Sequence, residues 1–391
     1  MKGIGKKAHL FVWALLILTI PLIAGGKQEV PKPETRKGEI PAGAGGQESF
    51  DLNALIQAAQ KEGEVVAYFT SSRIKDVGTA FEKKYGIKVK GTKMGDPEQA
   101  ERVIREVDSK NVLVDVIGFE DGALLEGKLI PEGYVVNWVP PDIAPSLSPE
   151  DRNPLVFLWQ PRIFGYNFES YKEPPIKNIW QLTEPAWKGK ILIRDPAQTP
   201  ANLAFFANIA TNPKLLEEAY RSYYGKPSGI SEKDIGWEFL KRLFQNELIV
   251  MRSDEDVGDA VGAAGQKEAP IGFYTLTKQR DNKAKNLKLA TMKGMVPFMG
   301  YALPTYALMV KNCPHPNAAK LLIHYILSEG HVPWTARDMG AFSPNPKAPP
   351  HPDNEGTWTD WQKRLLRIDN KVALKLRQEV LDLWLEYGHK K

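Results

Sequence analysis

Short apolar runs alternate with segments of helical periodicity from about residue 50 onwards. Residues 65–69, 87–92 and 112–117 have the length and composition of buried strands. The two segments between them, 74–85 and 97–107, place apolar residues on one face of a helix, and a proline opens the second. Strand, helix, strand, helix and strand at this spacing predict a parallel α/β sheet.

The same pattern returns in the second half of the chain. Residues 190–194, 249–252, 271–275 and 287–291 are further strand candidates, with helical segments between them. We therefore expect two α/β lobes with mixed sheets flanked by helices. Because ligands of open parallel sheets bind at the carboxyl ends of the strands, two such edges facing each other predict a cleft that closes over a ligand.

The first 26 residues predict a secretory signal. Three lysines lie within the first seven residues, an apolar stretch runs from Leu10 to Ala24, and small residues follow it. An uncleaved membrane anchor is the alternative, but this stretch is shorter than the ~20 residues of a spanning helix. No cysteine follows it, so a lipoprotein is not expected. Residues 27–48 are rich in Pro, Gly and charge and predict a flexible linker.

Charge and cysteine content narrow the function. The formal net charge is +5, and three positive charges lie in the acid-free first 26 residues, so the remaining chain carries only +2. Charge therefore does not indicate a nucleic-acid partner. The single cysteine, Cys313, excludes an intramolecular disulfide, and we expect an unreactive surface residue. Hydrolase, zinc-peptidase, P-loop and dinucleotide motifs are missing from the sequence, so we predict no enzyme activity and no cofactor.

Five segments resemble, in the right order, one family of proteins. They are 55–72 (LIQAAQKEGEVVAYFTSS), 80–89 (AFEKKYGIKV), 115–130 (with DVIGFEDGALLEGKLI), 186–196 (AWKGKILIRDP) and 312–329 (with NAAKLLIHYILSEG). The family is that of periplasmic solute-binding proteins of ABC importers, of the ferric-iron type. It also includes binders of thiamine, phosphonates and sugar phosphates.

The resemblance implies a type II periplasmic-binding-protein fold with two crossing hinge strands. Lobe one would comprise residues 49–160 and about 298–391, and lobe two residues 161–297. The implied role is an extracytoplasmic, periplasmic subunit that captures a small anionic solute, such as a phosphorylated or carboxylated metabolite. As a monomer it would deliver this solute to an ABC permease and ATPase. A ferric-iron binding protein is the first alternative, and a ligand-sensing subunit for a membrane receptor is the second.

Candidate binding residues in the first lobe follow the predicted strands. Ser71, Ser72 and Arg73 stand where a strand ends and a helix begins, a position that favours an anion, and the guanidinium can clamp a phosphate or carboxylate. The alternative is an ordinary helix start with a solvated arginine. Glu120 follows the third strand, and it is equally well explained as a ligand acceptor or as part of a helix cap.

Candidates in the second lobe have the same two explanations. Thr199 precedes a proline at a helix start, where the family places anion contacts, and it could equally be a simple cap. Ser253 and Asp254 begin another helix. Tyr274 and Thr275 end a strand at the expected cleft edge, with a core tyrosine as the competing view.

The segment VPFMGYALP contains the last candidate, Tyr301, which lies near the expected hinge and could line a pocket or pack there. Arg162 is given only a hinge role. Ferric binders of the family use adjacent tyrosines just after the strand ending at Tyr274, where this sequence has Thr277 and Lys278. The complete set of predicted ligand-binding residues is Ser71, Ser72, Arg73, Glu120, Thr199, Ser253, Asp254, Tyr274, Thr275 and Tyr301.

Overall fold

The computed structural model describes residues 50–388. The predicted signal segment 1–26 and the linker 27–48 lie outside the described residues. Within 50–388, no helix has the length and apolar character required to cross a membrane.

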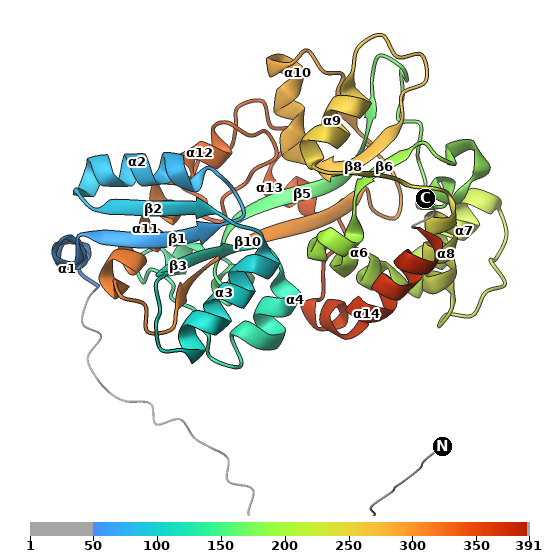
Figure 1. The fold of residues 1–391 in the computed structure, drawn as a ribbon. Coiled ribbons are helices and arrows are strands. Elements are labelled where there is room, and N and C mark those ends of the chain that lie inside the picture. Colours follow the sequence, from blue (N-terminus) through green and yellow to red (C-terminus); the bar gives the residue numbers. More distant parts are fainter. Residues whose placement is uncertain (1–49, 389–391) are drawn as a thin grey trace, which may run out of the picture. The chain divides into compact units, whose positions relative to one another are not determined.

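The first half of the described chain builds a small α/β layer structure (Figure 1). Asp51 caps its first helix by accepting hydrogen bonds from two backbone N–H groups, and Gly63 ends that helix with a φ of 76°. The elements are α1 (Leu52–Glu62), β1 (Glu64–Phe69), α2 (Ile74–Tyr85), β2 (Lys88–Lys93), α3 (Asp96–Asp108), β3 (Val116–Phe119), α4 (Gly122–Leu124), β4 (Val135–Val136), α5 (Pro149–Arg152) and the long strand β5 (Val156–Asn167).

The second α/β unit follows β5, and the chain then returns through a second long strand. The elements are β6 (Ile191–Arg194), α6 (Pro200–Ala210), α7 (Pro213–Tyr224), α8 (Ile235–Gln245), β7 (Ile249–Met251), α9 (Asp254–Gly262), β8 (Ile271–Thr275), α10 (Asp281–Ala284), β9 (Leu289–Thr291), β10 (Gly300–Val310), α11 (Pro316–Ser328), α12 (Val332–Thr335), α13 (Trp358–Gln362) and α14 (Asn370–Tyr387).

All strands belong to one mixed sheet whose main order is β2-β1-β3-β10-β5-β8-β6-β7. β1 pairs in parallel with β2 and β3, and β6 pairs in parallel with β7 and β8. The long strands β5 and β10 run antiparallel to each other from Gly300↔Ile163 to Tyr306↔Val156 and join the two parallel groups. The predicted mixed sheets and the two crossing strands are therefore confirmed.

The hydrophobic core has two large clusters, which we use to define two lobes. The first cluster, the first lobe, gathers buried side chains of α1, β1, α2, β3 and α11, and it extends to Ala341. The second cluster, the second lobe, gathers those of β6, α6, α8, β8 and α9. It also takes in Phe342, Trp361, Val380 and Trp384, and α14 contacts α6 and α8 (Figure 1). The helices α13 and α14 thus pack mainly with the second lobe and α11 with the first, whereas the sequence-based division placed all of residues 298–391 with the first.

Two local predictions differ from the structure. β3 begins at Val116 and not at residue 112, because its pairing with β1 starts at Ala67↔Val116. The buried Asp115 carboxylate instead accepts a hydrogen bond from the Val66 N–H at 2.7 Å. Cys313, expected at the surface, is buried, and burial raises the pKa of its thiol to about 12.

Candidate functional site

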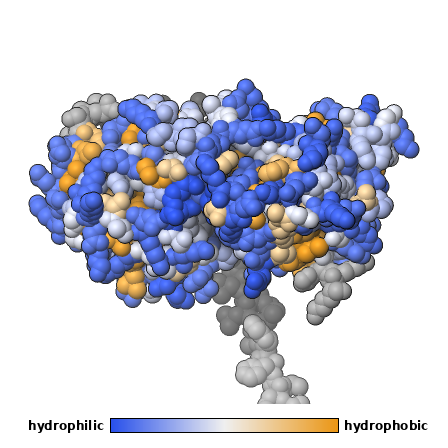
Figure 2. All heavy atoms as spheres, turned by 90° about the horizontal axis from the view of Figure 1, so that it is seen from above, coloured by the Kyte–Doolittle hydropathy of each residue, from blue (hydrophilic) through white to orange (hydrophobic). Residues whose placement is uncertain are grey.

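A cleft of about 550 Å³ lies between the lobes, where the parallel strands of both end. Residues at the ends of four strands line it: Thr70 follows β1, Glu120 follows β3, Arg194 ends β6 and Arg252 follows β7. The crossing strands supply Gln160, Arg162 and Leu303. Seen from above, the middle of the molecule is strongly hydrophilic, and apolar residues form separate groups to either side (Figure 2).

Eight of the ten predicted ligand-binding residues line this cleft. They are Ser71, Ser72, Arg73, Glu120, Thr199, Ser253, Asp254 and Thr275.

The remaining two predicted residues, both tyrosines, do not line the cleft. Tyr274 is fully buried in the second-lobe core, and its hydroxyl packs where a Cβ on Gly165 would stand, so the core alternative holds. Successive side chains of β8 point to opposite faces, which turns Tyr274 inward and Thr275 towards the cleft. Tyr301 is buried on β10 and borders a separate cavity of about 160 Å³ with Trp159. Burial raises the pKa of both tyrosines, so their hydroxyls stay protonated.

A buried ion pair joins a crossing strand to the second lobe. Arg162 donates from Nη2 to Asp254 Oδ2 at 2.8 Å and from Nη1 to Asn202 Oδ1 at 2.9 Å. Thr275 Oγ1 also donates to Asp254 Oδ2, at 2.8 Å. Burial acts to raise the pKa of Asp254, but the charges of Arg162, Arg194 and Lys278 outweigh it, so this pKa lies below its usual value. The hinge role predicted for Arg162 is thus incomplete, because its guanidinium reaches the cleft.

This ion pair leaves two polar atoms free. Within residues 50–388, neither Arg162 Nε nor Asp254 Oδ1 has a hydrogen-bond partner, and both side chains line the cleft. One is a donor and the other is an acceptor, so the pair can still receive one acceptor and one donor from a bound molecule.

The start of α6 presents an unused hydroxyl. Thr199 precedes α6, yet its side chain makes no capping hydrogen bond, and its Oγ1 is buried without a partner among the described residues. Arg194 also lines the cleft, and no ion pair to its guanidinium exists within 50–388. By contrast, Ser253 does act as a cap, since its Oγ accepts from the Asp256 N–H at 3.1 Å. The two predicted helix starts are therefore used differently.

Two carboxyl groups meet at the first-lobe side of the cleft. The Glu120 N–H donates to Asp96 Oδ1 at 3.0 Å, and Thr70 Oγ1 donates to Glu120 Oε1 at 2.9 Å. Burial, reinforced by the charge of Glu120, raises the pKa of Asp96 well above its usual value. Burial also raises the pKa of Glu120, against the hydrogen bond from Thr70. The Asp121 side chain caps α4, because its Oδ1 accepts from the Leu124 N–H at 3.1 Å.

Cations outnumber carboxylates around the cleft. Seven Lys and Arg side chains and five Asp and Glu side chains line it. The segment 276–280 contributes Lys278, which pairs with Glu255 at the start of α9. Burial, together with the charge of Arg280, lowers the pKa of Lys278 to about 8. Thr277 and Lys278 line the cleft, so the positions at which the family resemblance places a tyrosine pair do face it.

Sequence reasoning missed several cleft residues. Arg194 could have been found, because it ends a predicted strand at the edge where ligands bind. Asp338 and Arg280 carry no local signal, since neither ends a strand of the sequence pattern. None of the histidines in the described part of the chain, at 315, 324, 331 and 351, lines the cleft.

Two α/β lobes, crossing strands and a polar interlobe cleft define the class of two-lobed binding proteins, with the type II periplasmic-binding-protein fold. The sequence model of the family of bacterial extracellular solute-binding proteins matches residues 76–364. The chain belongs to this family. It is a solute-binding protein of the ABC-importer type. No curated protein matches the chain in sequence.

Solved structures of several proteins share the fold. Iron-bound HitA from Pseudomonas aeruginosa is 18% identical, with a TM-score of 0.64, over 83% of this chain and 99% of that one. AfuA from Actinobacillus pleuropneumoniae, with exogenous fructose-6-phosphate bound, is 19% identical, with a TM-score of 0.63, over 84% and 99%. The Trichodesmium IdiA (FutA) complex with iron and citrate is 18% identical, with a TM-score of 0.59, over 84% and 100%.

Proposed function

We propose that this protein captures a small anionic solute, a phosphorylated or carboxylated metabolite, in the interlobe cleft. It then delivers the solute to an ABC permease and its ATPase. Export by the N-terminal segment places it in the periplasm, where it acts as a monomer and without covalent chemistry. Binding favours the closed state, because only there do both lobes contact the solute.

The preference for an anionic solute rests on one observation: unused donors at the end of β6 and at the start of α6. The Thr199 hydroxyl is buried and unpartnered within the described chain, and the Arg194 guanidinium lines the same cleft without a carboxylate partner. The positive end of the helix dipole adds to their charge. A phosphate or carboxylate would satisfy these groups together through charge-assisted hydrogen bonds.

The orphan atoms of the ion pair suggest what else the solute carries. Asp254 Oδ1 accepts hydrogen bonds only, because the pKa of this carboxyl is lowered and the group is ionised. A solute hydroxyl or amine would supply the donor, and a further solute oxygen would accept from Arg162 Nε. The favoured solute is therefore an anion that also bears hydrogen-bond donors.

Ferric iron is the second candidate, since iron-bound HitA shares the fold. A bare ferric ion prefers several anionic oxygen ligands. Within residues 50–388, no group of three or more His, Cys, Asp or Glu side chains could hold a metal ion, and Tyr274 lies in the core. The organic anion consequently ranks first.

Native mass spectrometry of the protein, purified without denaturation, tests the proposal through whatever co-purifies. A bound phosphorylated or carboxylated metabolite supports it, and one iron per chain contradicts it. The variant Arg194→Gln should weaken binding of the recovered metabolite about tenfold or more. Arg105→Gln on α3 is the matched control, because Arg105 lies outside the cleft, its side chain is 67% exposed and it pairs only with Glu101 at 3.5 Å among the described residues. Solute-stimulated ATP hydrolysis by a permease complex would favour import over sensing.

A further inference from the structure

In the cleft, the carboxylate of Asp338 forms ion pairs with two arginines. Asp338 Oδ1 accepts from Arg73 Nη2 at 2.5 Å and from Arg280 Nη1 at 3.1 Å. Its side chain is only 5% exposed, against 15% for Arg73 and 26% for Arg280. All three residues line the interlobe cleft. Arg73, which was predicted to bind the anionic solute, therefore already pairs with a carboxylate of the protein itself.

The contacts of Asp338 place it with the first lobe. Its N–H donates to the Trp334 carbonyl at 2.8 Å, and the Trp334 ring packs 5.2 Å from Phe157 and 6.4 Å from Phe69 in the first cluster.

Arg280 belongs to the second lobe. It follows β8, and its Nη1 also donates to the Thr277 carbonyl at 3.0 Å. The pair between Asp338 and Arg280 thus spans the cleft from one lobe to the other.

We propose that Asp338 is a specificity-determining residue: its carboxylate joins the lobes through Arg73 and Arg280 and limits the negative charge that the cleft accepts in a solute. The proposal rests on the proposed function, capture of an anion. A fixed carboxylate beside the binding groups discriminates by repulsion, because an anion of high charge must approach it. Arg194 at the end of β6 then remains for the solute, because no carboxylate of the described chain forms an ion pair with it.

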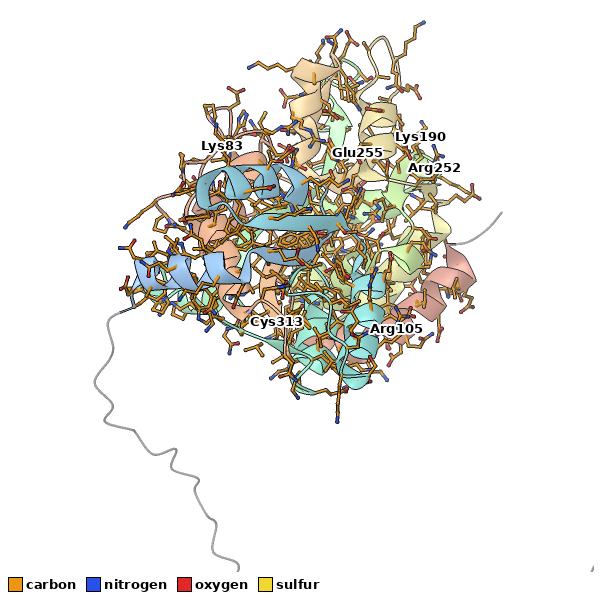
Figure 3. All side chains as sticks on the ribbon, turned by 60° about the vertical axis from the view of Figure 1, so that its left-hand side comes forward. Lys83, Arg105, Lys190, Arg252, Glu255 and Cys313 are labelled. Carbon is orange, nitrogen blue, oxygen red and sulfur yellow. The ribbon has the colours of Figure 1, made fainter. Side chains whose placement is uncertain are left out.

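The first experiment tests, without any solute, whether the pair between Asp338 and Arg280 links the two lobes and so fixes the distance between them. In the full chain with Cys313→Ser, spin labels are attached at Lys83→Cys on α2 and Lys190→Cys before β6, which lie on different lobes (Figure 3). Double electron–electron resonance measures the distance between the two labels. This distance should be longer and more broadly distributed in the variants Asp338→Asn and Arg280→Gln than in the labelled parent protein.

Asp76→Asn is the matched control for both variants. It breaks the neighbouring pair of Asp76 with Arg337, whose side chains are 54% and 62% exposed and both lie in the first lobe. The distance distribution of this control should equal that of the parent protein.

The second experiment compares inorganic phosphate with citrate by calorimetric titration. Asp338→Asn removes a repelling charge, so the affinity ratio of citrate to phosphate should rise about tenfold. Arg280→Gln removes an attracting charge, so the same ratio should fall. Two variants that both loosen the link but move the ratio in opposite directions separate charge selection from general damage to the fold.

Two results overturn the proposal. Unchanged distance distributions in both variants show that Asp338 does not join the lobes, and a ratio that fails to move in opposite directions shows that it does not select charge. If the parent protein binds neither anion, that result counts against the proposed function, and the distance measurement then decides alone whether Asp338 joins the lobes.

Discussion

The buried pair between Arg162 and Asp254 is the contact whose loss should cost this protein most. The two side chains are 3% and 9% exposed, so solvent screens them little. Asp254→Asn keeps the shape and removes the charge, and the Arg162 guanidinium then stays buried with a neutral Asn202 as its remaining partner. Because arginine does not deprotonate in proteins, the charge cannot be relieved.

The expected loss is about 3–5 kcal/mol in the free energy of unfolding, the usual cost of leaving one buried charge unpaired. Arg162→Met should cost less at acid pH than at neutral pH. In that variant burial, no longer opposed by Arg162, raises the pKa of Asp254, so lowering the pH protonates the carboxyl and restores stability. The double variant Arg162→Met/Asp254→Asn should lie within about 2 kcal/mol of the parent, because neither charge remains.

The parent protein should show the opposite response to acid. The pKa of Asp254 is lowered in the folded state, so its contribution to stability is complete above the unfolded pKa of about 4. This contribution is lost as the pH falls through the lower, folded value.

Urea unfolding followed by tryptophan fluorescence, at pH 7, pH 5 and pH 3 and without solute, measures all four members of this cycle. Thr199→Ala, a change in the same cleft without a charge, serves as the reference. Additive single and double variants, or a loss below about 1 kcal/mol for Asp254→Asn, would refute the reasoning that the pair is buried and dry.

Three further predictions follow from the cleft. Thr199→Val should leave the melting temperature unchanged, since the hydroxyl caps nothing, whereas Ser253→Ala should cost about 1 kcal/mol in urea unfolding by removing a cap; equal effects would contradict the difference in capping. The pKa of Lys278 is about 8, so phosphate affinity should fall between pH 7 and pH 9 as its positive charge is lost, and Lys278→Arg should flatten this profile in titration calorimetry. Tyr274→Phe removes a buried, unpartnered hydroxyl and should neither lower the melting temperature nor change solute affinity; a loss of affinity would return Tyr274 to the site.

Most of the candidate site was predictable because it follows strand ends. The residues Ser71 to Arg73, Thr199, Ser253 and Asp254 each stand directly after a predicted strand or at a helix start, and the carboxyl ends of parallel strands meet at one edge. Local spacing is enough for this inference. It does not say whether a hydroxyl at a helix start caps the helix, as Ser253 does, or stays free, as Thr199 does.

Tyr274 illustrates a second limit of prediction from the sequence, the face of the sheet on which a side chain lies. A shift of one residue along a strand exchanges the two faces of the sheet. Tyr274 and Thr275 are both compatible with the end of β8, and only the packing against Gly165 on β5 turns the tyrosine inward.

The sequence by itself determined the two α/β halves and the segments that meet between them, because periodicity and strand ends are local properties of the chain. The tertiary structure alone decided the partners of the charges. Arg162 meets Asp254 across 92 residues, and Arg73 meets Asp338 across 265. Such pairs depend on how β5, α9 and the segment after α12 pack around the cleft, and no spacing along the sequence encodes that contact.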